Sequence, residues 1–208
     1  MSFAARILRK LSIRGVPVPG LLRISRRPIA PVYLTFDDGP APQTTPQVLK
    51  LLREYKAQAT FFVCGQCVEK NSELTAEIIR NGHILANHTY SHPDLTRLTT
   101  SEALHEIERT QKLLAPFHSP RLFRPTRGLI GPRLWWALWR RGYRIIFWSQ
   151  DCGDWEGKPE SELATRLARR VQPGDVVLFH DDQPNSVAIL DLFLADTKSR
   201  GFQFDILQ

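Results

Sequence analysis

The sequence predicts an α/β fold in which a parallel sheet is surrounded by helices and is either open or closed into a barrel. Short apolar runs rich in β-branched and aromatic residues alternate with helical patterns, in about seven units. Polar residues gather directly after the apolar runs, where barrel and doubly wound α/β proteins carry their sites. A chain of 208 residues suffices for one domain with a substantial core.

The first half of the chain supplies three predicted strands with their helices. The run "VYLTF" at residues 32–36 predicts a buried strand. The next helix has Thr45 as its expected N-cap and Pro46 at its first position, and Gly82 ends the helix before the third strand. The predicted strands and helices of this half are 32–36, 45–55, 59–65, 72–83 and 83–88.

The second half continues the same alternation. Thr99 and Glu102 form a predicted capping box at the start of a helix over residues 100–114. The elements expected after it are a strand and loop at 121–128, a helix at 132–143, a strand at 144–151, a helix at 161–171, a strand at 174–181 and a helix at 186–201.

Positive charge is concentrated in an N-terminal arm of residues 1–30. The arm holds seven basic residues and no acid, which leaves 21 basic and 21 acidic residues for positions 31–208. A neutral domain argues against nucleic acid as a partner. The arm mixes cations with apolar residues such as Phe3 and Leu11. This pattern predicts either a solvated arm packed on the domain or a peripheral contact with an anionic membrane.

A cytoplasmic location is the expectation from the cysteines and the apolar runs. Three cysteines, an odd number, do not suggest a disulfide framework. No apolar run reaches the roughly 18 residues of a spanning helix. Arg and Lys interrupt the hydrophobic runs of the arm, unlike the apolar core of a cleaved signal peptide. If the arm binds lipid, we expect the protein on the inner face of the membrane.

Two aspartates and two histidines predict a metal centre. The motif "TFDDGP" places Asp37 and Asp38 side by side, where two carboxylates repel each other unless a cation is near. His88 and His92 lie four residues apart, so that one helical turn would bring both rings to the same side. Two imidazoles and a carboxylate suit one divalent ion, with zinc as the default and cobalt, nickel or iron as alternatives. The plainer interpretation is that the aspartates cap a turn.

Five motifs occur in the order seen in the polysaccharide deacetylase family: "TFDDGP", "HTYSHP", "RPTRG", "DCGDW" and "LFH". The chain from about Val32 to His180 resembles the NodB-homology domain of family 4 carbohydrate esterases, most closely the small NodB-type chitooligosaccharide deacetylases. The resemblance implies a distorted (β/α) barrel that forms a single domain over residues 31–208. It also implies metal-dependent hydrolysis of N- or O-acyl groups, with an N-acylated carbohydrate as substrate.

The resemblance further implies a role for each residue of the site. Asp37 corresponds to the catalytic base, which Arg124 pairs with and holds in place. His180 corresponds to the catalytic acid, which Asp154 orients. The remaining implied roles are metal binding by Asp38, His88 and His92, and contact with the acyl group by Trp155, Leu178 and the backbone N–H of Arg127.

The third motif departs from the usual family pattern, which reads Arg-Pro-Pro-Tyr/Trp-Gly. Here Thr126 and Arg127 stand between Pro125 and Gly128. The change removes an aromatic surface for sugar stacking and places a cation at the mouth of the site. This cation predicts either a phosphorylated or otherwise anionic sugar as substrate, or a side chain that simply points to solvent.

Four functions can be weighed against these patterns, and an N-deacetylase of amino sugars in a glycan is the leading one. A deacylase or deformylase of a lipid-phosphate- or nucleotide-linked amino sugar in cell-envelope biosynthesis would account for the arm and for Arg127. A glycosidase fits poorly, because its two carboxylates must stand roughly 5 Å or more apart across a sugar ring. A catalytically dead sugar-binding protein would have no need to keep Asp37, His88, His92, Arg124, Asp154 and His180 together.

Overall fold

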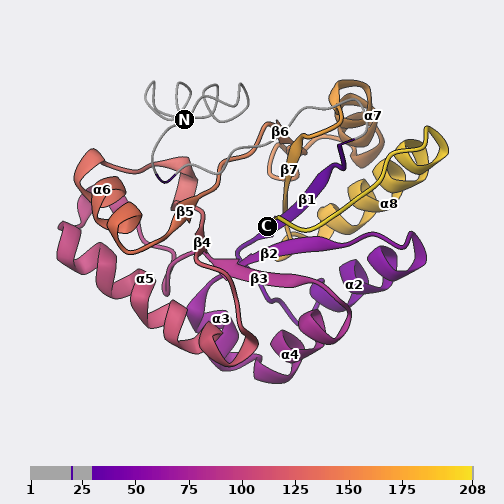
Figure 1. The fold of residues 1–208 in the computed structure, drawn as a ribbon. Helices are drawn as coiled ribbons and strands as arrows, with labels where there is room; N and C mark the ends of the chain where they lie inside the picture. The colour runs from indigo at the N-terminus through magenta and orange to yellow at the C-terminus, as the bar shows by residue number, and fades with distance from the viewer. Residues whose placement is uncertain (1–19, 21–29, 208) are drawn as a thin grey trace.

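The computed structural model describes residue 20 and residues 30–207, so that the arm of residues 1–30 lies almost wholly outside the described residues. A parallel sheet runs through the described part, with its strands in the order β5-β4-β3-β2-β1-β7-β6 (Figure 1). The strands are β1 (Tyr33–Asp37), β2 (Ala59–Val63), β3 (Ile84–Asn87), β4 (Leu122–Phe123), β5 (Arg144–Ile145), β6 (Gln150–Asp151) and β7 (Val176–His180).

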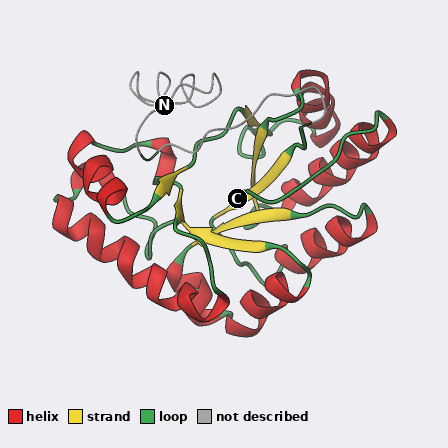
Figure 2. Ribbon diagram, in the orientation of Figure 1, coloured by secondary structure: helices red, strands yellow, loops and turns green. Residues whose placement is uncertain are grey.

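Helices lie outside the curled sheet, as Figure 2 shows. They are α2 (Thr45–Glu54), α3 (Gly65–Lys70), α4 (Ser72–Arg80), α5 (Thr100–Leu114), α6 (Pro132–Arg140), α7 (Glu160–Arg170) and α8 (Pro184–Ser199). Short 3₁₀ turns add η1 (Leu95–Arg97), η2 (Ala115–Phe117) and η3 (Thr126–Gly128). The predicted capping box at Thr99 and Glu102 is confirmed. The N-cap of α2 is Thr44, however, and not Thr45 as predicted.

The predicted strand at 144–151 is divided between the two edges of the sheet. β5 pairs with β4 and β6 pairs with β7. Just beyond these strands, Ile146 N donates to Phe123 O at 2.9 Å and Ser149 N donates to Val176 O at 2.9 Å. One segment therefore crosses from one edge of the curled sheet to the other. The distorted (β/α) barrel expected from the sequence is confirmed in this form.

Two hydrophobic layers lie on opposite sides of the strands, because side chains alternate along a strand with a period of two. Val177 and Phe179 of β7 pack against the helices in the largest cluster of buried residues. Val176 and Leu178 belong instead to a cluster of strand and loop residues on the inner side. His180 continues the second series and so lies on the inner side of the barrel, at the carboxyl end of β7.

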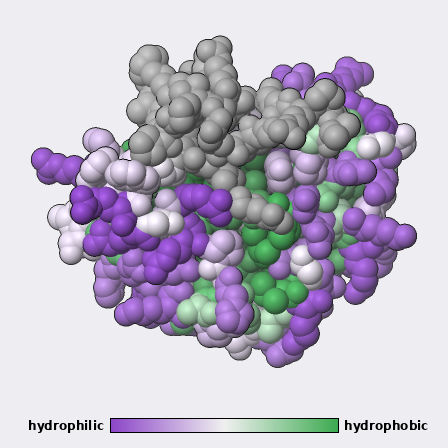
Figure 3. Space-filling model, viewed as in Figure 1, coloured by the Kyte–Doolittle hydropathy of each residue, from purple (hydrophilic) through white to green (hydrophobic). Residues whose placement is uncertain are grey.

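Hydrophilic residues cover most of the described surface in the view of Figure 3, and hydrophobic residues gather near its middle. Within residues 30–207, no helix has both the length and the apolar character needed to cross a bilayer. The large apolar side chains that are exposed include Trp136 and Trp155, with 53% and 66% of their surface accessible.

Candidate active site

The candidate site lies where β1, β3 and β7 end. Asp37 is the last residue of β1, and in the parallel pairing its Cα lies opposite that of His180, the last residue of β7. Asp38 follows β1 directly, and His88 follows β3. Because parallel strands end at the same edge of a sheet, residues distant in sequence meet here.

Asp38, His88 and His92 form a group that can hold a metal ion. One ligand atom from each lies within 4.8 Å of the others. Asp38 Oδ1 is 3.4 Å from His88 Nε2 and 3.3 Å from His92 Nε2. The same Asp38 oxygen is buried and has no hydrogen-bond donor among the described residues. A buried carboxylate oxygen facing two imidazole nitrogens fits a bound divalent cation.

The backbone of the following loop fixes the imidazole of His88. His88 Nδ1 lies 2.8 Å from Arg124 O, so that this nitrogen carries the proton and donates it. Burial lowers the pKa of His88 to about 3, which keeps the ring neutral. Nε2 therefore presents a lone pair toward Asp38 and His92, as a metal ligand requires.

The loop that carries the two histidines is not the helical turn predicted from their spacing. Thr89 and His92 have φ values of 70° and 55°, in the left-handed region. The amide of Asn87 holds the loop, because its oxygen accepts from Thr89 N at 3.0 Å and its nitrogen donates to Ile107 O at 2.8 Å. Asn87 and Thr89 are structural parts of the site that the sequence analysis missed.

Asp37 and Arg124 form a buried ion pair at the base of the site. Arg124 Nη1 donates to Asp37 Oδ1 at 2.6 Å and to Thr35 Oγ1 at 2.9 Å. The guanidinium stacks over Phe62, with 4.1 Å from its carbon to the ring centroid. Burial raises the pKa of Asp37, and the charge of Arg124 opposes this rise. The second carboxylate oxygen, Asp37 Oδ2, lies 3.7 Å from His88 Nε2 and so faces the metal-ligand group.

His180 and Asp154 form the second charged pair. His180 Nδ1 lies 2.8 Å from Asp154 Oδ1, and the backbone N–H of His180 donates to Asp154 Oδ2 at 2.8 Å. Ser186 also donates to this carboxylate. Burial works against protonation of His180, but the hydrogen bond and charge of Asp154 raise its pKa to about 9. Both ring nitrogens of His180 are therefore protonated at neutral pH, and the side chain is a cation.

The three residues expected to contact the acyl group lie in different surroundings. Trp155 follows Asp154 directly and is largely exposed, with 66% of its surface accessible. Leu178 is buried on the inner side of β7, in the same cluster as Phe62. The side chain of Arg127 is 62% exposed, and its Nη1 lies 3.7 Å from Asp94 Oδ2.

The sequence model of the family described as polysaccharide deacetylase matches residues 25–146, more than half of the chain. The chain belongs to the polysaccharide deacetylase family. The enzymes of this family are metalloenzymes, in keeping with the group formed by Asp38, His88 and His92.

Relatives and a solved structure agree with this assignment. A peptidoglycan-N-acetylglucosamine deacetylase of Bacillus cereus is 35% identical over 179 residues, which cover 83% of this chain and 84% of that protein. A chitooligosaccharide deacetylase of Bradyrhizobium sp. is 36% identical over 74% of this chain and 71% of that protein. The peptidoglycan deacetylase PdaC of Bacillus subtilis has a similar structure, with a TM-score of 0.80, 33% identity, and coverage of 87% and 90%. The predicted family and enzyme class, a hydrolase of non-peptide carbon–nitrogen bonds, are confirmed.

A buried carboxyl group behind the metal-ligand loop of this deacetylase was not predicted. Asp181 is 1% exposed, and its Oδ2 accepts a hydrogen bond from Thr45 Oγ1 at 2.6 Å. Burial raises the pKa of Asp181 to about 7. A Cβ atom on Gly39 would lie only 2.1 Å from Asp181 Oδ1. The carboxyl group thus packs directly against the turn that follows Asp38, and Thr45 serves this contact rather than a helix cap.

Proposed function

We propose that this deacetylase removes the N-acetyl group from an amino sugar within a glycan, with one divalent ion held by Asp38, His88 and His92. Zinc is the ion that two imidazoles and one carboxylate suit best, and cobalt, nickel and iron are the alternatives. One observation carries the proposal. The buried Asp38 Oδ1 has no hydrogen-bond donor within the described part of the chain and faces two histidine nitrogens, and Asp37 Oδ2 lies 3.7 Å from one of these nitrogens.

Asp38, His88 and His92 would hold the divalent ion, which would supply a Lewis acid for the amide carbonyl and for water. Asp37 is placed to accept a proton from the attacking water. Arg124 holds Asp37 Oδ1 at 2.6 Å, which leaves Oδ2 free on the side of the metal-ligand group. A carboxylate whose pKa burial has raised is a stronger general base than one in water.

His180 completes the hydrolysis as the general acid. The departing amine needs a proton, since an amide nitrogen does not leave as an anion. With a pKa raised to about 9, the imidazolium holds this proton at neutral pH and gives it up from Nε2, because Nδ1 is bound to Asp154. Water adds a hydroxyl group to the acyl carbon, the carbon–nitrogen bond breaks, and acetate and a free amine result.

The substrate assignment extends the relatives' reactions to this chain. The relatives are named for peptidoglycan N-acetylglucosamine and for chitooligosaccharide, and both are polymers of N-acetylated amino sugars. Trp155, largely exposed beside Asp154, supports the proposal, because an exposed aromatic face next to a catalytic pair is suited to pack against a sugar ring. We assign Leu178 to the inner wall of the site beneath His180, on the same side of β7.

Release of acetate and formate, measured separately, tests this function. Zinc-loaded protein is given chitooligosaccharides and peptidoglycan fragments in one set, and nucleotide- and polyprenyl-phosphate-linked N-acyl sugars in the other. We expect acetate from the first set, and none from the Asp37→Asn variant. Release from the second set alone would replace the proposal with the envelope-biosynthesis alternative.

Membrane contact through residues 1–30 and a cytoplasmic location stay predictions, since the arm lies almost wholly outside the described residues. Sedimentation with anionic liposomes tests the contact. Loss of sedimentation after deletion of residues 1–26 would support it, and equal sedimentation of both proteins would rule it out.

A further inference from the structure

A groove of about 470 Å³ is lined by residues that follow, along the chain, two loops of the candidate active site. One wall comes from residues 95–103, which begin three positions after His92, and the other from residues 129–134, which begin two positions after Arg127. Leu95, Leu98, Leu129 and Ile130 give the groove apolar walls, and Arg133 adds a cation to its lining. The groove thus continues the two loops that bear a metal ligand and the unusual arginine.

The backbone around Arg127 is supported by contacts of its neighbouring residues. Thr126 Oγ1 donates to Pro93 O at 2.6 Å, which ties this loop to the residue after His92. Arg127 itself has a φ of 54°, a conformation that few residues other than glycine adopt. A Cβ atom on Gly128 would lie 2.9 Å from the ring of Trp148, so the loop is also packed against the barrel interior.

Among the described residues around Arg127 and the groove, arginine side chains outnumber the carboxylates that are free to pair with them. Asp94 Oδ2 lies 3.7 Å from Arg127 Nη1 and 3.6 Å from Arg97 Nε, so that one carboxylate serves two guanidinium groups at long distance. The other oxygen of Asp94 already accepts from Thr96 N and Thr96 Oγ1. Glu102, near the far end of the groove, is engaged in capping α5. With respect to residues 30–207, Arg127 therefore keeps donors available for an anion from solution.

We propose that Arg127 determines substrate specificity by binding an anionic group, a carboxylate or a phosphate, on the sugar next to the one that is deacetylated. The aliphatic part of that substituent lies in the apolar groove. A guanidinium group presents paired donors that match both anions, whereas the aromatic residue usual at this position favours neutral sugar faces. The inference rests on the proposed function, because it places the acetylated sugar at Asp37 and His180.

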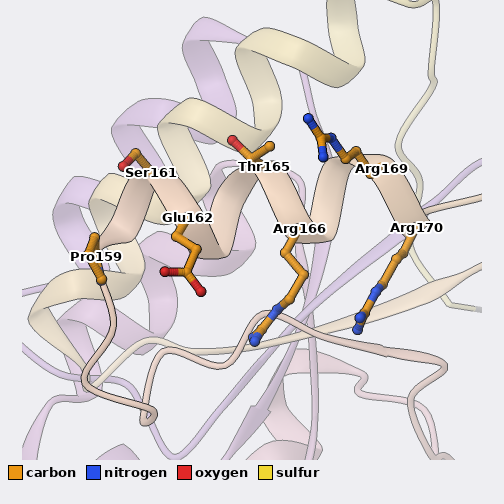
Figure 4. A pocket seen from close by; sticks show the side chains of 7 residues that line it. All are labelled: Pro159, Ser161, Glu162, Thr165, Arg166, Arg169 and Arg170. Atoms are coloured by element: carbon orange, nitrogen blue, oxygen red, sulfur yellow. The ribbon is translucent and has the colours of Figure 1, made fainter.

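A second hollow also carries arginines but does not compete for this role. It has a volume of about 680 Å³ and follows α7, as Figure 4 shows. Arg166 in this hollow is held by both carboxylate oxygens of Glu156, each at 2.8 Å. The lining residues lie at positions 159–170, along one helix and not on the loops that carry the metal ligands.

The test compares kcat/KM for acetate release from four matched substrates. They are a neutral N-acetylglucosamine oligomer, a glycan of alternating N-acetylglucosamine and N-acetylmuramic acid, the same glycan with its carboxylates converted to amides, and an N-acetylglucosamine oligomer with a terminal phosphate. The variants are Arg127→Gln and, as matched control, Arg97→Gln, which removes an arginine next to the same Asp94.

In the wild type we expect at least one anionic substrate to be preferred over its neutral counterpart. Arg127→Gln should lower that preference roughly tenfold, mainly through KM, as expected for one charge-assisted contact. Arg97→Gln should leave the preference for the anionic substrate within about twofold of the wild-type value. Loss on the muramic acid glycan alone identifies a carboxylate, and loss on the phosphorylated oligomer alone identifies a phosphate. An unchanged preference in Arg127→Gln, or no preference in the wild type, overturns the proposal.

Calorimetric binding separates this inference from the proposed function. The same glycans are titrated into zinc-loaded Asp37→Asn protein, with and without the Arg127→Gln change. Weaker binding of the anionic glycan in the double variant supports the role of Arg127 even where no acetate is released. Equal binding by both proteins contradicts it even where hydrolysis is normal.

Discussion

The centre and the edges of the sheet contribute to the site in different ways. The central strands β1, β2, β3 and β7 have four or five residues, and nearly all of these are buried. The edge strands β4, β5 and β6 have two residues each. Asp37, Asp38, His88 and His180 come from the ends of central strands, whereas the segments after β4 and β6 supply the buried partners of Asp37 and His180.

At both edges of the sheet, the segment after the edge strand supplies one buried and one exposed residue near the site. After β4 the chain supplies buried Arg124 and exposed Arg127, and after β6 it supplies buried Asp154 and exposed Trp155. The buried member of each pair binds a residue of a central strand, Asp37 or His180. We infer that the centre carries the chemistry, the buried edge residues position it, and the exposed edge residues select the substrate. Substitutions should therefore have smaller effects from the centre outwards.

The largest effect is expected for Asp37→Asn at the centre. Loss of the general base should lower kcat for acetate release by roughly 10²–10⁴-fold. Asparagine still accepts a hydrogen bond, and the metal ligands are untouched, so one zinc per chain should remain. Metal analysis together with kinetics checks this. Retention of more than about a tenth of the activity would remove Asp37 from the base role.

Gly39→Ala tests the packing behind the metal-ligand loop. A Cβ atom would lie 2.1 Å from the buried Asp181 carboxyl, so the turn or the carboxyl must move. We expect the free energy of unfolding to fall by about 1–3 kcal/mol, with weaker zinc binding. Gly131→Ala is the matched control, because no atom of the other described residues lies within 4 Å of a Cβ there, apart from its chain neighbours. Urea unfolding of both variants measures the difference, and equal stability would show that Asp181 does not constrain the turn.

Asp154→Asn tests how an edge residue tunes a central one. His180 acts as an acid only while protonated, so activity should fall as the pH rises through its pKa of about 9. Without the charge of Asp154, that pKa should drop toward the ordinary value of about 6.5. The alkaline limb of the kcat profile should then move to lower pH.

The profile is measured from pH 5 to 10, with the exposed Asp182→Asn as control. An alkaline limb that stays in place in Asp154→Asn would show that Asp154 does not set the protonation of His180.

Trp155→Ala should have the smallest effect of the set. Because the side chain is 66% exposed, the free energy of unfolding should change by no more than about 0.5 kcal/mol. Loss of a packing surface for the sugar should raise KM by roughly fivefold, which corresponds to about 1 kcal/mol. Trp136→Ala, a tryptophan of α6 that is 53% exposed, should leave KM unchanged. Equal KM values for both variants would take Trp155 out of the substrate site.

The same contrast explains what could be predicted from the sequence. The central strands are continuous buried runs followed at once by polar residues, so that the positions of Asp37, His88 and His180 follow from the pattern. The segment at 144–151 also has an apolar run, at 145–148, but its two ends pair with different strands, and only the curvature of the sheet decides this.

Backbone conformation and burial of charge were less accessible to sequence reasoning. The left-handed φ values of Thr89 and His92 give no signal, because neither residue is glycine, and the spacing suggested a helical turn instead. No pattern in the sequence indicated the position of Asp181, which is buried and packs against the turn at Gly39. Such a contact depends on packing between distant segments, and periodicity within one segment does not report it.

Removal and return of the metal show whether deacetylation depends on an ion held by Asp38, His88 and His92. Zinc is stripped from the wild type, from His88→Gln and from His105→Gln, whose histidine is exposed on α5, and is then titrated back while acetate release from a chitooligosaccharide is followed. We expect acetate release to stop when the metal is removed. It should return at one zinc per chain in the wild type and in His105→Gln, but not in His88→Gln. Release that survives metal removal, or a His88→Gln variant that binds one zinc and regains full activity, would contradict it.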